Sequence, residues 1–208
     1  METPYACYLQ LPDLLDLQQP RSPKDRPAQW ADEHFFITVH QSAEVLVSQA
    51  LVDLDRAARQ ARSGQDAGAA TSLRRVTAVV DVLAAHLALL DHLAPDSFAS
   101  FRPLLGNASG AQSSQFTELF RRIAMPDCLG SAGGEGQTQS GEGQEQSGDG
   151  QTEGRQAADA LWSLRAAVTR WRTRHLLLVE RMIGDRPGTG GTSGLAYLRS
   201  RIDLPPRG

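Results

Sequence analysis

Residues 29–62 read QWADEHFFITVHQSAEVLVSQALVDLDRAARQAR, and this stretch decides the fold class. Its apolar positions recur about every 3.6 residues, the period of an α-helix that buries one face in a core. The residues on that face are Phe36, Ile37, His40, Val47, Leu51 and Leu54. The pair Ser63-Gly64 ends the pattern. The sequence therefore predicts one long amphipathic helix here.

Two other long segments repeat the helical pattern. Residues 71–93 predict a second helix, which ends before Ala94-Pro95 because proline disfavours the α conformation in the preceding residue. Residues 156–183 predict a third long helix, and a short one begins near Gln115. Alternating strand patterns are missing from the sequence. We therefore expect an all-α protein built as a helical bundle.

A stretch of very different composition interrupts the chain at residues 130–154, which read GSAGGEGQTQSGEGQEQSGDGQTEG. With no apolar side chain beyond Ala132, it buries too little surface to offset the entropy lost on ordering. The sequence thus predicts a disordered acidic linker. One helical domain would span residues 1–208, with an N-terminal part at 1–129 and a C-terminal part at 155–208.

The bulk composition excludes several classes of protein. A formal net charge of −3 over 208 residues, without a basic stripe, argues against nucleic acid as a partner. No run approaches the roughly 18 apolar residues of a membrane span, and the N-terminus lacks the basic region of a signal peptide. Cys7 and Cys128 have no metal-site spacing. We expect a cytoplasmic protein that binds neither nucleic acid nor membrane.

Five histidines are the main candidates for chemistry. His175 lies within the third long helix, where a neutral imidazole could bind iron axially. His86 shares an apolar helix face and is an equally good ligand by spacing alone. His40 follows Phe36 by four residues, so the two rings would share an apolar pocket. His34 and His92 lie near helix ends with charged neighbours, which indicates solvated side chains.

Residues 188–194 read GTGGTSG and could form a backbone nest for an anion. The segment lacks the lysine of a nucleotide-binding loop and follows no predicted strand. Its composition alone favours a flexible connector.

Four separated blocks carry a family resemblance. They are YACYL at 5–9 with Leu14-Leu15; Glu33 and FITVHQ at 36–41 with Glu44; residues 95–116; and His175 with VER at 179–181, IG at 183–184, GTGGTSG at 188–194 and YLR at 197–199. In this order the blocks resemble the tryptophan 2,3-dioxygenase superfamily. The resemblance covers most of the chain outside the acidic linker.

The resemblance implies an all-helical enzyme that binds haem b through one histidine and uses O2 as co-substrate. Its substrate would be L-tryptophan, opened at the indole C2–C3 bond to N-formylkynurenine, or a substituted tryptophan. The family usually assembles as a homotetramer in which N-terminal segments complete the pocket of a neighbouring subunit. The chain is therefore expected to form a homo-oligomer.

The resemblance also implies roles for single residues. His175 corresponds to the axial iron ligand, and His40 to the distal histidine that accepts a hydrogen bond from the indole N–H. Arg102 corresponds to the arginine that binds the substrate carboxylate, a task suited to its planar fork. Thr189 would contact the amino-acid backbone of the substrate, and Ser109 would lie near the carboxylate and haem edge. The residues expected to surround the indole are Phe36, Tyr5, Tyr8 and Leu9.

Two departures from the family pattern keep other functions open. Phe98 stands where the family commonly has tyrosine, so one hydroxyl in the substrate region is lost. The acidic stretch at 130–154 occupies the place of a longer helical insertion. One alternative is monooxygenation of a methylated tryptophan to an oxindole, another is a non-catalytic haem-binding sensor or paralogue, and a third is a helical interaction protein without a cofactor.

Overall fold

The computed structural model describes residues 3–125, 128–129, 149–184 and 198–199. Within these ranges the chain forms helices and no strand, as the sequence predicted. The α-helices are α1 (Pro4–Leu9), α2 (Leu11–Asp16), α3 (Pro27–Arg62), α4 (Asp66–His86), α5 (Pro95–Phe101), α6 (Ser114–Ala124) and α7 (Asp149–Ile183). Three 3-10 helices are η1 (Leu87–His92), η2 (Arg102–Leu105) and η3 (Gly110–Gln112).

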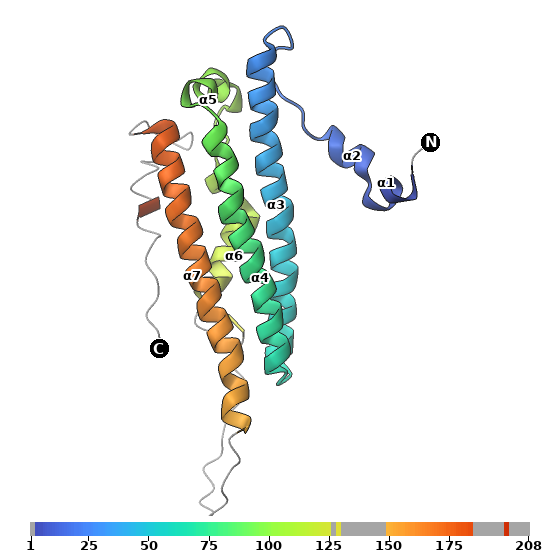
Figure 1. Cartoon of the computed structure of the whole chain (residues 1–208), viewed down its shortest axis with the longest axis vertical. Helices are drawn as coiled ribbons and strands as arrows, with labels where there is room; N and C mark the ends of the chain where they lie inside the picture. Colours follow the sequence, from blue (N-terminus) through green and yellow to red (C-terminus); the bar gives the residue numbers. More distant parts are fainter. Residues whose placement is uncertain (1–2, 126–127, 130–148, 185–197, 200–208) are drawn as a thin grey trace, which may run out of the picture.

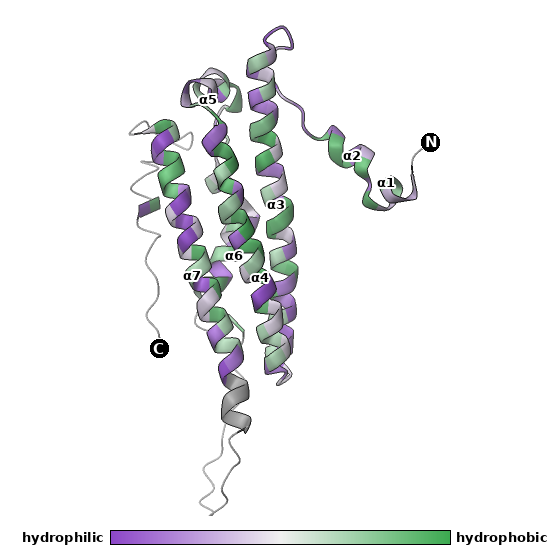
Figure 2. Cartoon of the chain, in the orientation of Figure 1, coloured by the Kyte–Doolittle hydropathy of each residue, from purple (hydrophilic) through white to green (hydrophobic). Residues whose placement is uncertain are grey.

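Three long helices, α3, α4 and α7, form the body of the molecule, with α4 packed against both of the others (Figure 1). Hydrophobic and hydrophilic residues are interspersed along each of them, as expected of amphipathic helices (Figure 2). A tight turn joins α3 to α4 and contains Gly64 at a φ of +73°, a conformation that favours glycine. The fully buried core between the helices includes Val47, Leu54, Leu73, Val76, Leu119 and Leu164.

The helix boundaries refine the predictions. The second predicted helix begins earlier, at Asp66, and its last turn tightens into the 3-10 helix η1, a common helix ending. Helix α7 begins at Asp149, within the segment predicted to be disordered. Polar residues can extend a helix beyond its apolar stripe because elongation needs no new nucleation. Residues 130–148 of the predicted linker lie outside the described residues.

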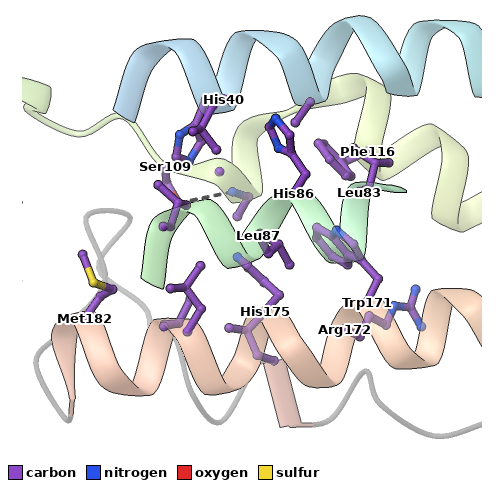
Figure 3. A pocket seen from close by; sticks show the side chains of 18 of the residues that line it. His40, Leu83, His86, Leu87, Ser109, Phe116, Trp171, Arg172, His175 and Met182 are labelled. Atoms are coloured by element: carbon purple, nitrogen blue, oxygen red, sulfur yellow. Dashed lines mark hydrogen bonds between the residues drawn. The ribbon is translucent and has the colours of Figure 1, made fainter. Parts of the chain in front are cut away.

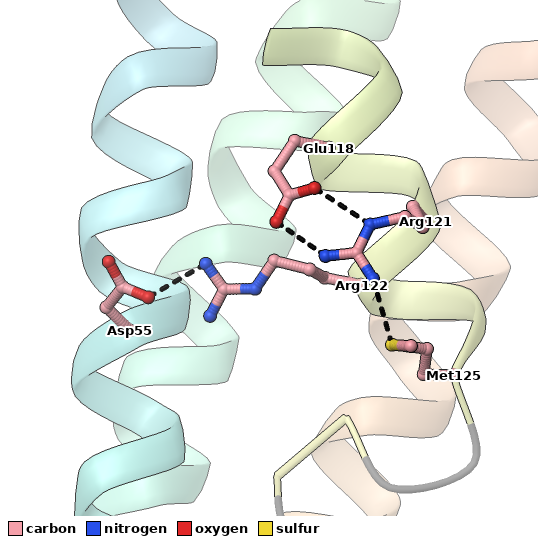
Figure 4. A network of polar contacts seen from close by, with 5 residues as sticks. All are labelled: Asp55, Glu118, Arg121, Arg122 and Met125. Atoms are coloured by element: carbon pink, nitrogen blue, oxygen red, sulfur yellow. Dashed lines mark hydrogen bonds and ion pairs between the residues drawn. The ribbon is translucent and has the colours of Figure 1, made fainter. Parts of the chain in front are cut away.

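Helix α6 is fixed against its neighbours by polar contacts as well as by buried apolar side chains. Arg122 forms an ion pair of 2.8 Å with Asp55 on α3, and Arg121 pairs with Glu118 at 2.8 Å within α6 (Figure 4). From α7, the Arg165 guanidinium donates hydrogen bonds to two carbonyl oxygens at the end of α6. Exposed ion pairs contribute little free energy, so these contacts mainly orient a helix that apolar burial stabilises.

The N-terminal segment leaves the bundle, and α1 and α2 project away from it (Figure 1). The connection to α3 is held by the buried carboxylate of Glu33, which accepts hydrogen bonds from the backbone N–H groups of Arg21 at 3.1 Å and Ser22 at 2.7 Å. On α1, the side chains of Tyr5 and Tyr8 are exposed, at 69% and 87%. The N-terminal segment is therefore anchored near Arg21 and Ser22, while the aromatic residues of α1 are exposed.

Of the single helices described, α3 is the one with the length and hydropathy of a membrane span, in a window of mean hydropathy 1.2. Core helices of soluble proteins meet the same criterion. Helix α3 packs along α4 and carries two buried carboxylates, Glu33 and Asp53. We interpret it as a bundle helix.

Candidate functional site

A cavity of about 790 Å³ lies between α3, α4 and α7 and is bordered by the segment from α5 to α6 (Figure 3). This volume is typical of sites for cofactors and small molecules. Three histidines line it, His40 from α3, His86 from α4 and His175 from α7. Most of the remaining wall is apolar, including Val39, Leu83, Leu87, Leu90, Phe116, Trp171 and Leu178.

The structure brings together six of the predicted site residues in this cavity: Phe36, His40, Phe98, Arg102, Ser109 and His175. Tyr5, Tyr8 and Leu9 lie on the projecting helix α1, are exposed, and do not line the cavity of their own chain. Thr189 lies outside the described residues.

His40 is held in one orientation by its own helix. Its Nδ1 lies 2.7 Å from the carbonyl oxygen of Phe36. A carbonyl can only accept, so Nδ1 carries the proton and Nε2 is left as an acceptor. Burial, the largest cause, lowers the pKa of His40 from 6.5, against opposing contributions from the Phe36 carbonyl and Glu44. His40 is exposed and lines the cavity, and because its pKa lies below 6.5 the ring is neutral at pH 7.

His175 has a different environment on the facing helix α7. Its ring stacks on Trp171, one turn earlier, with centroids 5.0 Å apart. Burial lowers its pKa to about 4, and nearby His40 adds to the shift, so the imidazole is neutral at pH 7. Neither ring nitrogen has a hydrogen-bond partner in the part of the chain that the structure describes. A neutral imidazole with unused nitrogens beside an apolar cavity is suited to bind a metal.

His86, which spacing could not separate from His175, is already engaged. Its Nε2 lies 2.9 Å from the hydroxyl oxygen of Ser42 on α3. The nitrogen at the tip of the side chain is therefore occupied by a protein contact. The structure distinguishes the two histidines, and His175 is the better candidate for a metal ligand.

The depressed histidine pKa values predict acid sensitivity of the protein without added haem. Between pH 6.5 and about 4, the unfolded chain binds a proton at His175 and the folded chain does not. The free energy of unfolding should fall with falling pH in this window, by up to about 1.4 kcal/mol per pH unit for each such histidine. Urea unfolding from about pH 7 to about pH 4 measures the slope. His175→Leu should reduce this slope. His92→Leu, which replaces an exposed histidine of η1, should leave the slope unchanged. Equal slopes in all three proteins would contradict the lowered pKa of His175.

Cationic and polar side chains supply the remaining chemistry of the cavity. Arg102 lines it from η2, and Arg172 lies over the ring of Phe120 with its guanidinium carbon 4.9 Å from the centroid. Ser109 is held by a capping box, because its hydroxyl accepts from the backbone of Ala111 and its own N–H donates to Gln112. The sequence signal for this cap is the motif S-x-x-Q at 109–112, which helical periodicity does not report.

An all-α bundle whose cavity holds neutral histidines and arginines among apolar walls defines a class, the helical proteins with an internal site for a cofactor or small molecule. The profile of the tryptophan 2,3-dioxygenase family matches residues 1–125 and 148–205. The chain belongs to this family.

Similar proteins agree with this assignment. The tryptophan 2,3-dioxygenase of Nocardioides sp. is 34% identical over 245 residues, which cover 96% of this chain and 89% of that protein. The tryptophan 2,3-dioxygenase of Anaeromyxobacter dehalogenans is 30% identical, with 97% and 91% covered, and that of Pseudomonas fluorescens Pf-5 is 31% identical, with 96% and 86% covered. These alignments are longer than the 208 residues of the chain. The relatives therefore contain residues that this chain lacks.

Proposed function

We propose that the chain is a haem-dependent oxygenase that acts on the indole C2–C3 bond of L-tryptophan or of a substituted tryptophan. One observation carries the proposal: neutral His175 and neutral His40 project from two different helices, α7 and α3, at the same apolar cavity (Figure 3). One imidazole has unused nitrogens for a metal, and the other offers a fixed acceptor.

The cavity residues fit haem b. His175 would supply a nitrogen ligand to the iron, apolar side chains such as Leu87 and Leu178 would provide the apolar surroundings, and Arg172 would be available to pair with a carboxylate of the group. When bound, haem b supplies the iron chemistry that activates O2. The protein contributes the ligand nitrogen, the apolar surroundings and the placement of the substrate.

The chain's own residues would place an indole amino acid. The Nε2 atom of His40 accepts a hydrogen bond from the indole N–H, and this contact fixes the direction of C2 and C3. The Arg102 guanidinium binds the substrate carboxylate through two parallel hydrogen bonds. Phe36 and Phe98 pack against the indole. The ring centroids of Phe36 and His40 are 4.0 Å apart. Thr189 would add a contact to the amino-acid backbone.

The exposed aromatic side chains of α1 support assembly into a homo-oligomer. Tyr5, Tyr8 and Leu9 occupy a helix that projects from the bundle, and they do not line the cavity of their own chain. We propose that they complete the cavity of another subunit in the tetramer that the family resemblance implies. The proposed location of this tetramer is the cytoplasm.

The test of the proposed function is the product mass. The protein reconstituted with haemin is reduced and mixed with O2 and L-tryptophan, and in parallel with methylated tryptophans. A gain of two oxygen atoms is expected for dioxygenation, and a gain of one would assign the oxindole reaction. Haem binding without any product would identify a non-catalytic haem protein. Absence of both haem binding and reaction would leave a helical interaction protein and overturn the proposal.

A further inference from the structure

The cavity contains a third histidine, His86, to which the proposed function assigns no role. His86 is the last residue of α4, lines the cavity, and makes its hydrogen bond to Ser42 across the interface with α3. His86 also contributes to lowering the pKa of His40, so the two imidazoles lie near one another. The wall around it is largely apolar, and a polar ring in such surroundings costs free energy unless its nitrogens are hydrogen-bonded.

The surroundings of Ser42 fix the tautomer of His86. The Ser42 hydroxyl oxygen lies 2.6 Å from the carbonyl oxygen of Thr38 and 3.2 Å from that of Val39. A hydroxyl has one proton, and carbonyls only accept, so this proton points back to the helix. Toward His86 the hydroxyl must therefore act as the acceptor. The Nε2 atom of His86 carries the hydrogen, and Nδ1 is a lone-pair acceptor.

This acceptor is unused within the described residues. No hydrogen bond to Nδ1 of His86 occurs there, and burial lowers the pKa of His86, which keeps the ring neutral at pH 7. Two charged groups of the cavity already have partners: Glu44 accepts from Gln115 at 3.0 Å, and Arg121 pairs with Glu118. The cavity thus has two neutral imidazoles whose N–H groups are both bonded to α3, each with one acceptor nitrogen remaining.

We propose that Nδ1 of His86 accepts a hydrogen bond from a hydroxyl or amino group on the benzenoid ring of the substrate. A hydroxy- or amino-substituted tryptophan would then be the preferred substrate. This inference rests on the proposed function, in which the indole N–H donates a hydrogen bond to Nε2 of His40. Unsubstituted tryptophan has a single ring donor and leaves the second acceptor unpaired. A substrate with two ring donors satisfies both acceptors, so His86 determines specificity without touching the reacting carbons.

Ligand affinity tests the proposal directly. The haem-reconstituted protein is titrated without O2 with L-tryptophan and with its 4-, 5-, 6- and 7-hydroxy derivatives, and binding is followed by the Soret band. Each hydroxy compound is paired with the methyl compound of the same position, which has a similar size and no donor. We expect one hydroxy isomer to bind up to about tenfold more tightly than its methyl partner, the effect of one net hydrogen bond.

Variants of the pair separate specificity from structure. His86→Leu should abolish the hydroxyl preference, measured as the ratio of the affinities for the hydroxy and methyl compounds. His86→Gln keeps both an acceptor oxygen and a donor for Ser42, so it should retain part of the preference. It also serves if the leucine variant does not fold. Ser42→Ala should weaken the preference, because the ring loses the acceptor that fixes its tautomer.

The outcomes distinguish this inference from the proposed function. If L-tryptophan binds but no hydroxy isomer is preferred, or if the preference is unchanged in His86→Leu and His86→Gln, the role of His86 is refuted and the proposed function stands. If no indole compound binds to the haem-loaded protein, the proposed function fails and the role of His86 fails with it.

Discussion

Replacing His175 with alanine is expected to remove the protein's ligand to haem iron and to reduce turnover of tryptophan by more than about 100-fold. The expectation rests on an imidazole that is neutral, lines the cavity and has no hydrogen-bond partner among the described residues. Loss of a residue that merely orients a metal ligand typically costs about 10–100-fold, so loss of the ligand itself should cost more. Haemin titration followed by absorbance, and product formation, measure the two effects.

Two controls define this experiment. His92→Ala changes an exposed histidine of η1 outside the cavity and should leave the Soret band and the turnover unchanged. Free imidazole added to His175→Ala should restore part of the histidine-ligated spectrum, because the substitution leaves space for it. An unchanged spectrum in His175→Ala would show that another side chain binds the iron, and His86 would be the first to examine.

The long helices could be predicted from sequence because each buries one continuous apolar face. In α3 that face gave the correct end at Arg62 and a start within two residues of Pro27. The projecting helices α1 and α2 could not be found in this way, since they contain no buried residue. Most of their apolar side chains are exposed, and helical periodicity indicates a helix only where a face is buried.

The candidate site was predictable only in part, because spacing reports which face of a helix is buried and not what that face meets. His86 and His175 had equivalent positions on apolar faces, and the contact that separates them joins His86 to Ser42, 44 residues away. The family resemblance named six residues that the structure gathers in one cavity. No local signal could have paired His86 with Ser42, because this contact depends on the packing of α4 against α3.

Replacing Phe101 with alanine is expected to lower the free energy of unfolding by about 3–5 kcal/mol, the usual cost of emptying a fully buried phenylalanine site. Phe101 is completely buried at the end of α5. Its ring packs edge-to-face on two others. The ring centroids are 5.5 Å apart for Phe98, with an interplanar angle of 88°, and 5.6 Å apart for Phe36, with an angle of 62°. Phe36 in turn supports the ring of His40, so the substitution also removes support from the predicted substrate contact.

Urea unfolding of the protein without haem measures the loss of stability, and tryptophan affinity of the haem-loaded protein measures the effect on the site. Phe101→Leu is the matched control, because it keeps most of the volume and should cost well under half as much as alanine. Phe98→Ala should also cost less, since Phe98 is only partly buried. A loss below about 1 kcal/mol in Phe101→Ala would mean that the surrounding rings close the space, and that α5 is held to α3 by contacts other than this aromatic cluster.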